Sequence, residues 1–171
     1  GQTEALSAGV PLLGERLLSA LYVNELLVRL LPAHEKEAEV FEDYSRLLYA
    51  LAGNAGLEPL LRSFELQLLD VLGYGLQLTH EVVTGEIIHA DAWYQLQGEG
   101  GFIRQPPGVS DTLVLYAGND LMAMARRDFS NAETRRAAKR LLRTALQQQL
   151  GSRELASRAL FAKPALPTST P

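Results

Sequence analysis

Hydrophobic residues recur at helical spacing through the N-terminal half of the chain. Residues 12–31, LLGERLLSALYVNELLVRLL, carry apolar positions around nearly the whole circumference of a helix, which predicts a largely buried helix that ends at Pro32. A second helix is predicted from about Glu37 to Ala52. Its apolar stripe consists of Val40, Phe41, Tyr44, Leu47, Leu48 and Leu51.

A third helix is predicted within residues 58–75, EPLLRSFELQLLDVLGYG. Pro59 suits its first turn, and Gly73 suits its end. Its apolar stripe consists of Leu61, Phe64, Leu68 and Leu72. The short connections between the three helices favour antiparallel neighbours in a bundle.

Helical periodicity is lost after Tyr74. Short β-like runs, AWYQL and GFI, flank the turn QGEGG, and Pro106, Pro107 and Gly108 indicate a loop. We therefore expect residues 74–109 to form a small irregular insert with at most one β-hairpin.

Helices return in the C-terminal part. A short helix is predicted from Gly118 to Arg126. A long one is predicted to begin with Ser130 as its N-cap and Glu133 in a capping box, and to continue to Gly151. Its inner stripe consists of Ala138, Leu141, Leu142, Ala145, Leu146 and Leu150. A last short helix is predicted to hold Arg158 to Phe161.

Together these patterns predict a mainly α fold, a bundle of about five to six helices with a small irregular β-hairpin insert. The helical domain comprises 9–73 and 110–163, and the insert comprises 74–109. Residues 164–171 are rich in Pro, Ser and Thr and are expected to be a disordered tail.

Composition narrows the possible functions. The chain has no cysteine, which removes disulfides, thiolate nucleophiles and cysteine-based zinc sites and fits a cytoplasmic protein. Charge interrupts every apolar run, so no membrane span is expected. Residues 1–100 carry 15 acidic and 5 basic residues, whereas residues 101–171 carry 5 acidic and 11 basic ones. This asymmetry suggests a surface at the C-terminal end that faces a polyanion.

The basic residues concentrate on and just before the long C-terminal helix. They are Arg126, Arg127, Arg135, Arg136, Lys139, Arg140 and Arg143. Such a density of cations suits phosphate binding, because affinity grows with each counterion released. The alternative is a solvated face that pairs with the acidic half of the chain. Aromatic residues do not interleave with these cations, which weakens an interpretation based on base stacking.

No catalytic motif is present. The chain lacks a P-loop, a G-x-G-x-x-G after a strand, a G-x-S-x-G and an H-E-x-x-H. His34 lies in a polar turn, and His80 and His89 lie in the insert near three acidic residues, Glu81, Glu86 and Asp91. Zinc could use such ligands, but the spacing H-x8-H matches no compact ligand pattern. We expect neither an enzyme nor a metal or cofactor site; an unrecognised hydrolase would need a deep pocket with convergent acids or histidines.

Arg62 places a fixed positive charge at the edge of the third helix's apolar stripe. It could pair with Glu58 or Glu65 on its own helix, a surface interaction of about 0.3–0.5 kcal/mol. It could instead cover apolar surface with its long side chain. A third use is to hold a carboxylate whose attached side chain enters an apolar groove. The residues alone favour the first.

Five segments, in this order, resemble the helical C-terminal part of the RecO family of recombination mediators and DNA repair proteins. They are LYVNELLVRLL (21–31), VFEDYSRLLYALAG (40–53), RSFELQLLDVLGYG (62–75), FSNAETRRAAKRLLRTAL (129–146) and LASRALF (155–161). The resemblance extends from about Thr3 to Lys163. It implies that an N-terminal OB-fold is missing and that residues 1–8 are the remnant of the linker that leaves it. The chain is thus expected to be a C-terminal fragment.

The resemblance implies a non-enzymatic binding role in the cytoplasm, near the nucleoid. RecO-like proteins bind the acidic, Phe-ending C-terminal tail of single-stranded DNA-binding protein (SSB). They also bind single- and double-stranded DNA, promote strand annealing and act with RecR to load RecA. The arginine of the family's R-x-F-E-L segment faces the tail's carboxylate, and Arg62 occupies that position here. Leu61, Phe41 and Tyr44 are further candidates for the tail groove.

The basic face is then expected to meet DNA or RecR. Some family members hold zinc with four cysteines in the insert; this chain has none, which implies a metal-free insert. The alternative to a binding module is a purely structural helical domain that supports an OB-fold and has no ligand of its own.

Overall fold

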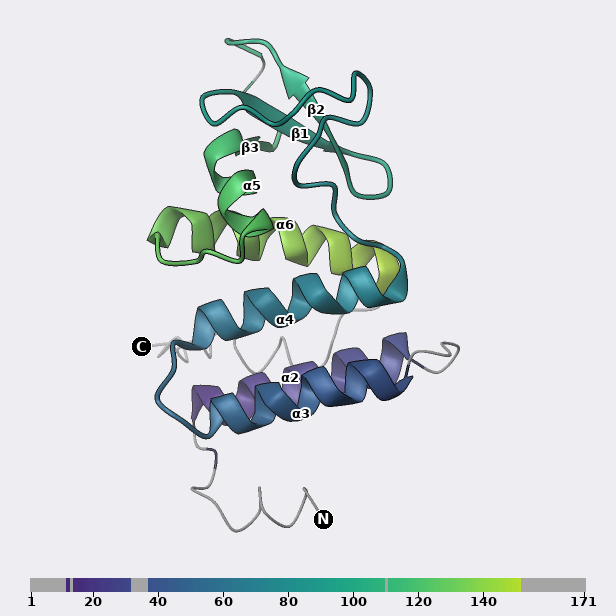
Figure 1. The fold of residues 1–171 in the computed structure, drawn as a ribbon, viewed down its shortest axis with the longest axis vertical. Coiled ribbons are helices and arrows are strands. Elements are labelled where there is room, and N and C mark those ends of the chain that lie inside the picture. The colour runs from purple at the N-terminus through teal and green to yellow at the C-terminus, as the bar shows by residue number, and fades with distance from the viewer. Residues whose placement is uncertain (1–11, 13, 32–36, 110, 152–171) are drawn as a thin grey trace, which may run out of the picture.

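The computed structural model describes residues 12, 14–31, 37–109 and 111–151 (Figure 1). Within these ranges the helices are α2 (Glu15–Leu30), α3 (Glu37–Leu51), α4 (Leu57–Leu72), α5 (Gly118–Ala125) and α6 (Ala132–Leu150). The strands are β1 (Trp93–Gln97), β2 (Gly101–Gln105) and β3 (Leu115–Ala117). The fold is mainly α with a small β insert, as predicted. His34, the helix expected at 158–161 and the tail at 164–171 lie outside the described residues.

The helices form layers beneath the sheet. In Figure 1, α2 and α3 lie at one end, α4 packs against α3, α6 packs against α4, and α5 joins α6 to the sheet at the other end. α2 also contacts α6. The largest fully buried side chains are Tyr94, Tyr116, Phe102, Leu26, Leu51, Leu68, Leu69, Leu121, Met124, Leu141, Leu142 and Leu146. A core therefore runs from the helices into the insert.

α4 ends at the predicted residue and begins at Leu57, one residue before the predicted range. Pro59 lies in the first turn, where its missing N–H costs no helical hydrogen bond. Gly73 follows the last turn with φ of 86°, and the Tyr74 N–H donates to the Leu69 carbonyl at 2.9 Å. This left-handed cap closes the helix and redirects the chain into the insert.

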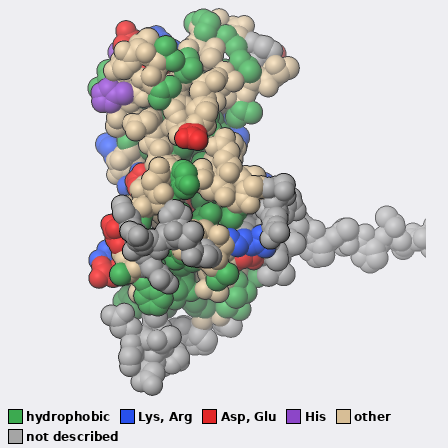
Figure 2. Space-filling model, turned by 90° about the vertical axis from the view of Figure 1, so that its right-hand side faces the viewer, with side chains coloured by type: hydrophobic (Ala, Val, Ile, Leu, Met, Phe, Trp, Pro, Cys, Tyr) green, Lys and Arg blue, Asp and Glu red, His purple; other side chains and the backbone are tan. Residues whose placement is uncertain are grey.

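α2 and α3 are less buried than their sequences predict. Leu26 and Leu27 of α2 are buried, but Leu17, Leu21 and Val28 are exposed. Phe41 was expected in the stripe of α3, yet it is 61% exposed and meets only the edge of the Tyr44 ring among the described aromatic contacts, with centroids 6.2 Å apart. The helix surface that packs against neighbours is narrower than the apolar stripe. Figure 2 shows hydrophobic side chains gathered at this helical end of the molecule.

The sheet contains the hairpin predicted in the insert and an additional strand from outside it. β1 pairs with β2 and, on its other side, with β3, giving the order β2-β1-β3 with antiparallel pairing throughout. The β3 strand follows the expected insert boundary at 109, so the sheet extends beyond it. With only three residues, this strand is too short to be recognised from an alternation of apolar and polar positions. Tyr94, Phe102 and Tyr116 point into the core.

Gly118 allows α5 to begin directly beside the insert. A Cβ at this position would lie 1.8 Å from the His89 carbonyl oxygen and 3.1 Å from the Tyr94 ring. The Gly118 N–H donates to the Ala92 carbonyl at 2.8 Å. Only a residue without a side chain fits, so this contact fixes how the sheet sits on the helices.

The N-cap of α6 is Asn131 rather than Ser130. The Asn131 side chain accepts a hydrogen bond from the Glu133 N–H at 2.8 Å. Ser130 is already engaged, because its N–H and hydroxyl both donate to Asp128 Oδ1, at 3.1 and 2.7 Å. These two hydrogen bonds, the hydroxyl's first, hold the pKa of the Asp128 carboxyl below its usual value. The predicted cap was wrong by one residue, because both residue types suit the position.

Candidate functional site

A pocket of about 510 Å³ lies where α2, α4 and α6 meet. Its lining residues are Glu15, Ser19 and Tyr22 of α2, Leu57, Glu58, Leu61, Arg62 and Glu65 of α4, and Lys139 and Arg143 of α6. The sequence placed Arg62 and Leu61 in one candidate site and the α6 cations in another. The structure brings them together.

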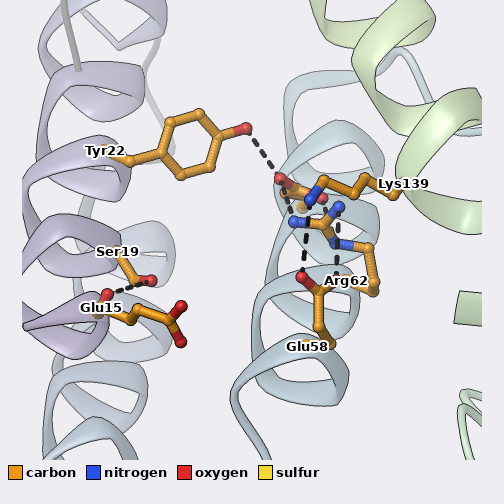
Figure 3. Close-up of polar contacts among 7 residues, drawn as sticks. Glu15, Ser19, Tyr22, Glu58, Arg62 and Lys139 are labelled. Atoms are coloured by element: carbon orange, nitrogen blue, oxygen red, sulfur yellow. Dashed lines mark hydrogen bonds and ion pairs between the residues drawn. The ribbon is translucent and has the colours of Figure 1, made fainter. Parts of the chain in front are cut away.

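Arg62 forms the floor of this pocket with a carboxylate of its own helix. Its Nε lies 3.0 Å from Glu65 Oε2, and its Nη2 donates to Glu65 Oε1 at 3.3 Å. The Tyr22 hydroxyl donates to the same Oε1 at 2.7 Å (Figure 3). Arg62 is 5% exposed and Glu65 is 2% exposed. The pairing with Glu65 was predicted, but as a surface pair; α2 and α6 cover it, so it is a buried one.

Glu58 occupies the mouth of the pocket. Its Oε2 lies 3.9 Å from Arg62 Nη1, and its Oε1 lies 3.7 Å from Lys139 Nζ. Both distances are longer than a hydrogen bond. The Glu58 side chain is 41% exposed and that of Lys139 is 64% exposed. Figure 3 shows the Glu58 carboxylate beside the Arg62 guanidinium, with the Lys139 side chain reaching in from α6.

The pocket combines cations, the carboxylates of Glu15, Glu58 and Glu65, and apolar surface. Arg62, Lys139 and Arg143 bring positive charge, and Leu57 and Leu61 bring hydrocarbon. A guanidinium binds carboxylates through directed N–H donors, and leucine side chains accommodate a ring or an alkyl chain. The arrangement therefore fits a ligand in which a carboxylate stands next to an apolar group.

Phe41 and Tyr44, the other candidates for this groove, lie on α3 and do not line the pocket. Tyr44 is half-buried, and burial raises the pKa of its hydroxyl above the usual value. The two residues form an aromatic pair in which Phe41 is exposed and Tyr44 packs against the core.

Three residues of the predicted basic face make contacts within the fold. Arg127 Nη2 donates to Asp70 Oδ2 at 3.0 Å and ties the α5–α6 connection to α4. Arg135 Nη1 donates to two backbone carbonyls just before α6, at 2.7 and 2.8 Å. Arg140 Nη2 donates to the Leu115 carbonyl at 3.1 Å, and its guanidinium lies 5.0 Å from the centre of the Tyr116 ring.

The outward-facing cations form a row along α6. Arg136, Lys139 and Arg143 are exposed and follow the i, i+3, i+7 spacing of one helix face. Lys139 and Arg143 also line the pocket. Arg126, which precedes this helix, is exposed as well. The row thus leads along the helix to the pocket. The sequence did not predict that the two adjoin, because α4 and α6 are far apart in the chain.

The insert shows no metal cluster in the part of the chain that the structure describes: no three or more His, Asp or Glu side chains are grouped to hold an ion. His80 Nδ1 lies 2.9 Å from Thr79 Oγ1, and the backbone N–H of His89 donates to the Tyr94 hydroxyl at 2.9 Å. None of the described helices has the length and apolar character needed to cross a membrane.

Comparison with known proteins gives one consistent result. The family model described as "Recombination protein O C terminal" matches residues 13–159. The DNA repair protein RecO of Psychromonas ingrahamii is 42% identical over 158 residues, which are 92% of this chain and 67% of that protein. The protein of the same name from Pseudomonas putida is 45% identical over 166 residues, 95% of this chain and 70% of the relative. That of Pseudomonas aeruginosa is 46% identical over 160 residues, 91% and 66% respectively. The chain spans about two thirds of the length of these relatives.

Proposed function

The chain belongs to the RecO family of DNA repair and recombination proteins, and on this basis we propose that its pocket binds the C-terminal tail of SSB. The observation that carries the proposal is the position of Arg62, a buried guanidinium beside Leu57 and Leu61 at the floor of an open pocket. A tail that ends in phenylalanine offers a ring and a terminal carboxylate on the same residue. The pocket offers a partner for each.

The contacts of Arg62 suggest how the tail carboxylate would be held. Glu65 takes the Nε and Nη2 side of the guanidinium, and Nη1 is the nitrogen that points toward Glu58 at the mouth. The tail carboxylate would accept from this side, with Lys139 close enough to add a second cation. Leu57 and Leu61 would pack against the ring.

The cationic row of Arg136, Lys139 and Arg143 is the proposed contact for DNA phosphates or for RecR. The module would act without catalysis of its own, in the cytoplasm and near the nucleoid. In strand annealing and RecA loading it would keep SSB, DNA and RecR together. The acidic part of the tail and the DNA backbone would both be attracted to the same row, because both are polyanions.

The proposal is tested by fluorescence-anisotropy titration with a labelled acidic peptide ending in phenylalanine and with the same peptide lacking that residue. We expect binding of the first and loss of binding with the second. Lys139→Gln and Arg143→Gln are each expected to weaken binding about threefold to tenfold, since each removes an exposed cation at the pocket. Arg136→Gln, one turn away on the same row, is the matched control with a smaller effect.

Failure of a folded protein to bind either peptide would overturn the tail proposal. It would favour a purely structural helical domain that supports an OB-fold. Circular dichroism and thermal unfolding of each variant establish that the exposed substitutions leave the fold intact.

A further inference from the structure

The pocket mouth contains a carboxylate that belongs to the chain itself. Glu58 stands between Arg62 Nη1 and Lys139 Nζ, 3.9 and 3.7 Å from these atoms. Building on the function proposed above, we propose that Glu58 is an internal competitor for the tail carboxylate. It lies between two cations of the pocket and must turn outward before a ligand carboxylate takes its place.

The two carboxylates around Arg62 differ in how firmly they are held. Glu65 is 2% exposed, lies 3.0 Å from the guanidinium and receives the Tyr22 hydroxyl as well. Glu58 is 41% exposed and touches its cations only at ion-pair distance. Exposed ion pairs are weak, whereas a buried charge cannot give up its partner without a large penalty. Glu58 is therefore the exchangeable carboxylate of the two.

Because of its position in the helix, Glu58 can turn outward at a small cost in free energy. It lies in the first turn of α4, where the helix dipole favours a negative side chain whichever rotamer it adopts. Turning toward water, it exchanges two long contacts for full hydration and stays near the helix N-terminus. Arg62 then keeps its pair with Glu65, but its Nη1 and the Nζ of Lys139 no longer face the Glu58 carboxylate.

This arrangement makes the pocket selective for anionic ligands. A neutral apolar group could reach Leu57 and Leu61, but it would leave Glu58 on its cations and gain nothing from them. A ligand carboxylate replaces Glu58 and takes over both cations. Glu58 thus weakens binding of the correct ligand moderately and makes the free carboxylate the feature that is recognised.

The test compares Glu58→Gln with the wild type, using the Phe-ending acidic peptide with either a free C-terminal carboxylate or a C-terminal amide. Glu58→Gln removes the competing charge and is expected to tighten binding of the free-carboxylate peptide about threefold to tenfold. The amidated peptide is expected to change less than twofold. Thermal unfolding of the variant should match that of the wild type.

Glu15→Gln is the matched control. Glu15 lines the same pocket from α2, and among the described residues no ion pair joins it to Arg62 or Lys139. Glu15 carries the same charge as Glu58. If Glu15→Gln tightened peptide binding equally, the gain would come from reduced charge repulsion in general, and the inference would be overturned.

The two proposals fail differently. Wild-type binding that Glu58→Gln leaves unchanged, or that it strengthens equally for both peptides, would overturn the competitor role and leave tail binding intact. Absence of binding by both the folded wild type and the folded variant would overturn tail binding and the competitor role together.

Discussion

At the scale of residues, the buried ion pair of Arg62 and Glu65 has the largest expected effect on the free energy of unfolding. Two charges withdrawn from water gain their stability from each other and from the Tyr22 hydroxyl, and each would be costly alone. The spacing in the sequence predicts that Arg62 can pair with Glu58 or Glu65 of its own helix. It does not predict the burial, because the covering residues come from α2 and α6, distant in sequence.

Arg62→Ala is expected to destabilise the protein by about 3–5 kcal/mol, because it leaves Glu65 buried without its guanidinium. The measurement is the free energy of unfolding from urea denaturation. Arg62→Met combined with Glu65→Leu removes both charges at similar volume and should cost less than the single change. A single-variant cost below about 1 kcal/mol would contradict the buried pair, since that is the range of surface pairs. Exposed pocket residues are therefore the better variants for binding experiments.

At the scale of elements, hydrophobic periodicity predicts the helices. It does not predict features that depend on contacts between elements, such as a short strand or the burial of a side chain. α3, α4, α5 and α6 lie within a few residues of their predicted ranges. For α3, α4 and α6 the signal was an apolar stripe at helical spacing. β3 was missed because three residues show no alternation, and it is defined only by pairing with β1. Phe41 belongs to the stripe by spacing, but no described helix covers that side of α3.

The start of α6 gives a prediction at this scale. Asn131→Ala is expected to destabilise the protein by about 1 kcal/mol, because the Glu133 N–H loses its acceptor at the helix N-terminus. Thermal or denaturant unfolding measures the effect. Ser130→Ala removes only the hydroxyl contact to Asp128 and should cost less. The reverse order of the two costs would restore Ser130 as the cap.

At the scale of the whole molecule, the basic residues of the C-terminal part divide into two groups, those that make contacts within the fold and those that face outward. Arg127 ties the segment before α6 to Asp70 of α4, and Arg135 donates to carbonyls just before α6. Arg140 is exposed but connects α6 to the Leu115 carbonyl and the Tyr116 ring. Arg136, Lys139 and Arg143 remain on the surface. Composition predicts the basic end of the molecule, but only the packing of α4, α5 and the insert against α6 separates structural cations from available ones.

This division predicts which cations determine DNA affinity. If the outward row meets phosphates, log affinity for a DNA oligonucleotide should fall linearly with log salt concentration. Neutralising Arg136, Lys139 and Arg143 together with glutamine should reduce the magnitude of that slope by about 2–3, since each phosphate contact contributes about 0.7–0.9. Fluorescence anisotropy across a salt series measures both quantities. Arg46→Gln on α3, an exposed arginine remote from the row, should leave the slope unchanged. If the triple variant keeps the wild-type slope, DNA does not contact this row, and RecR becomes the partner to test against it.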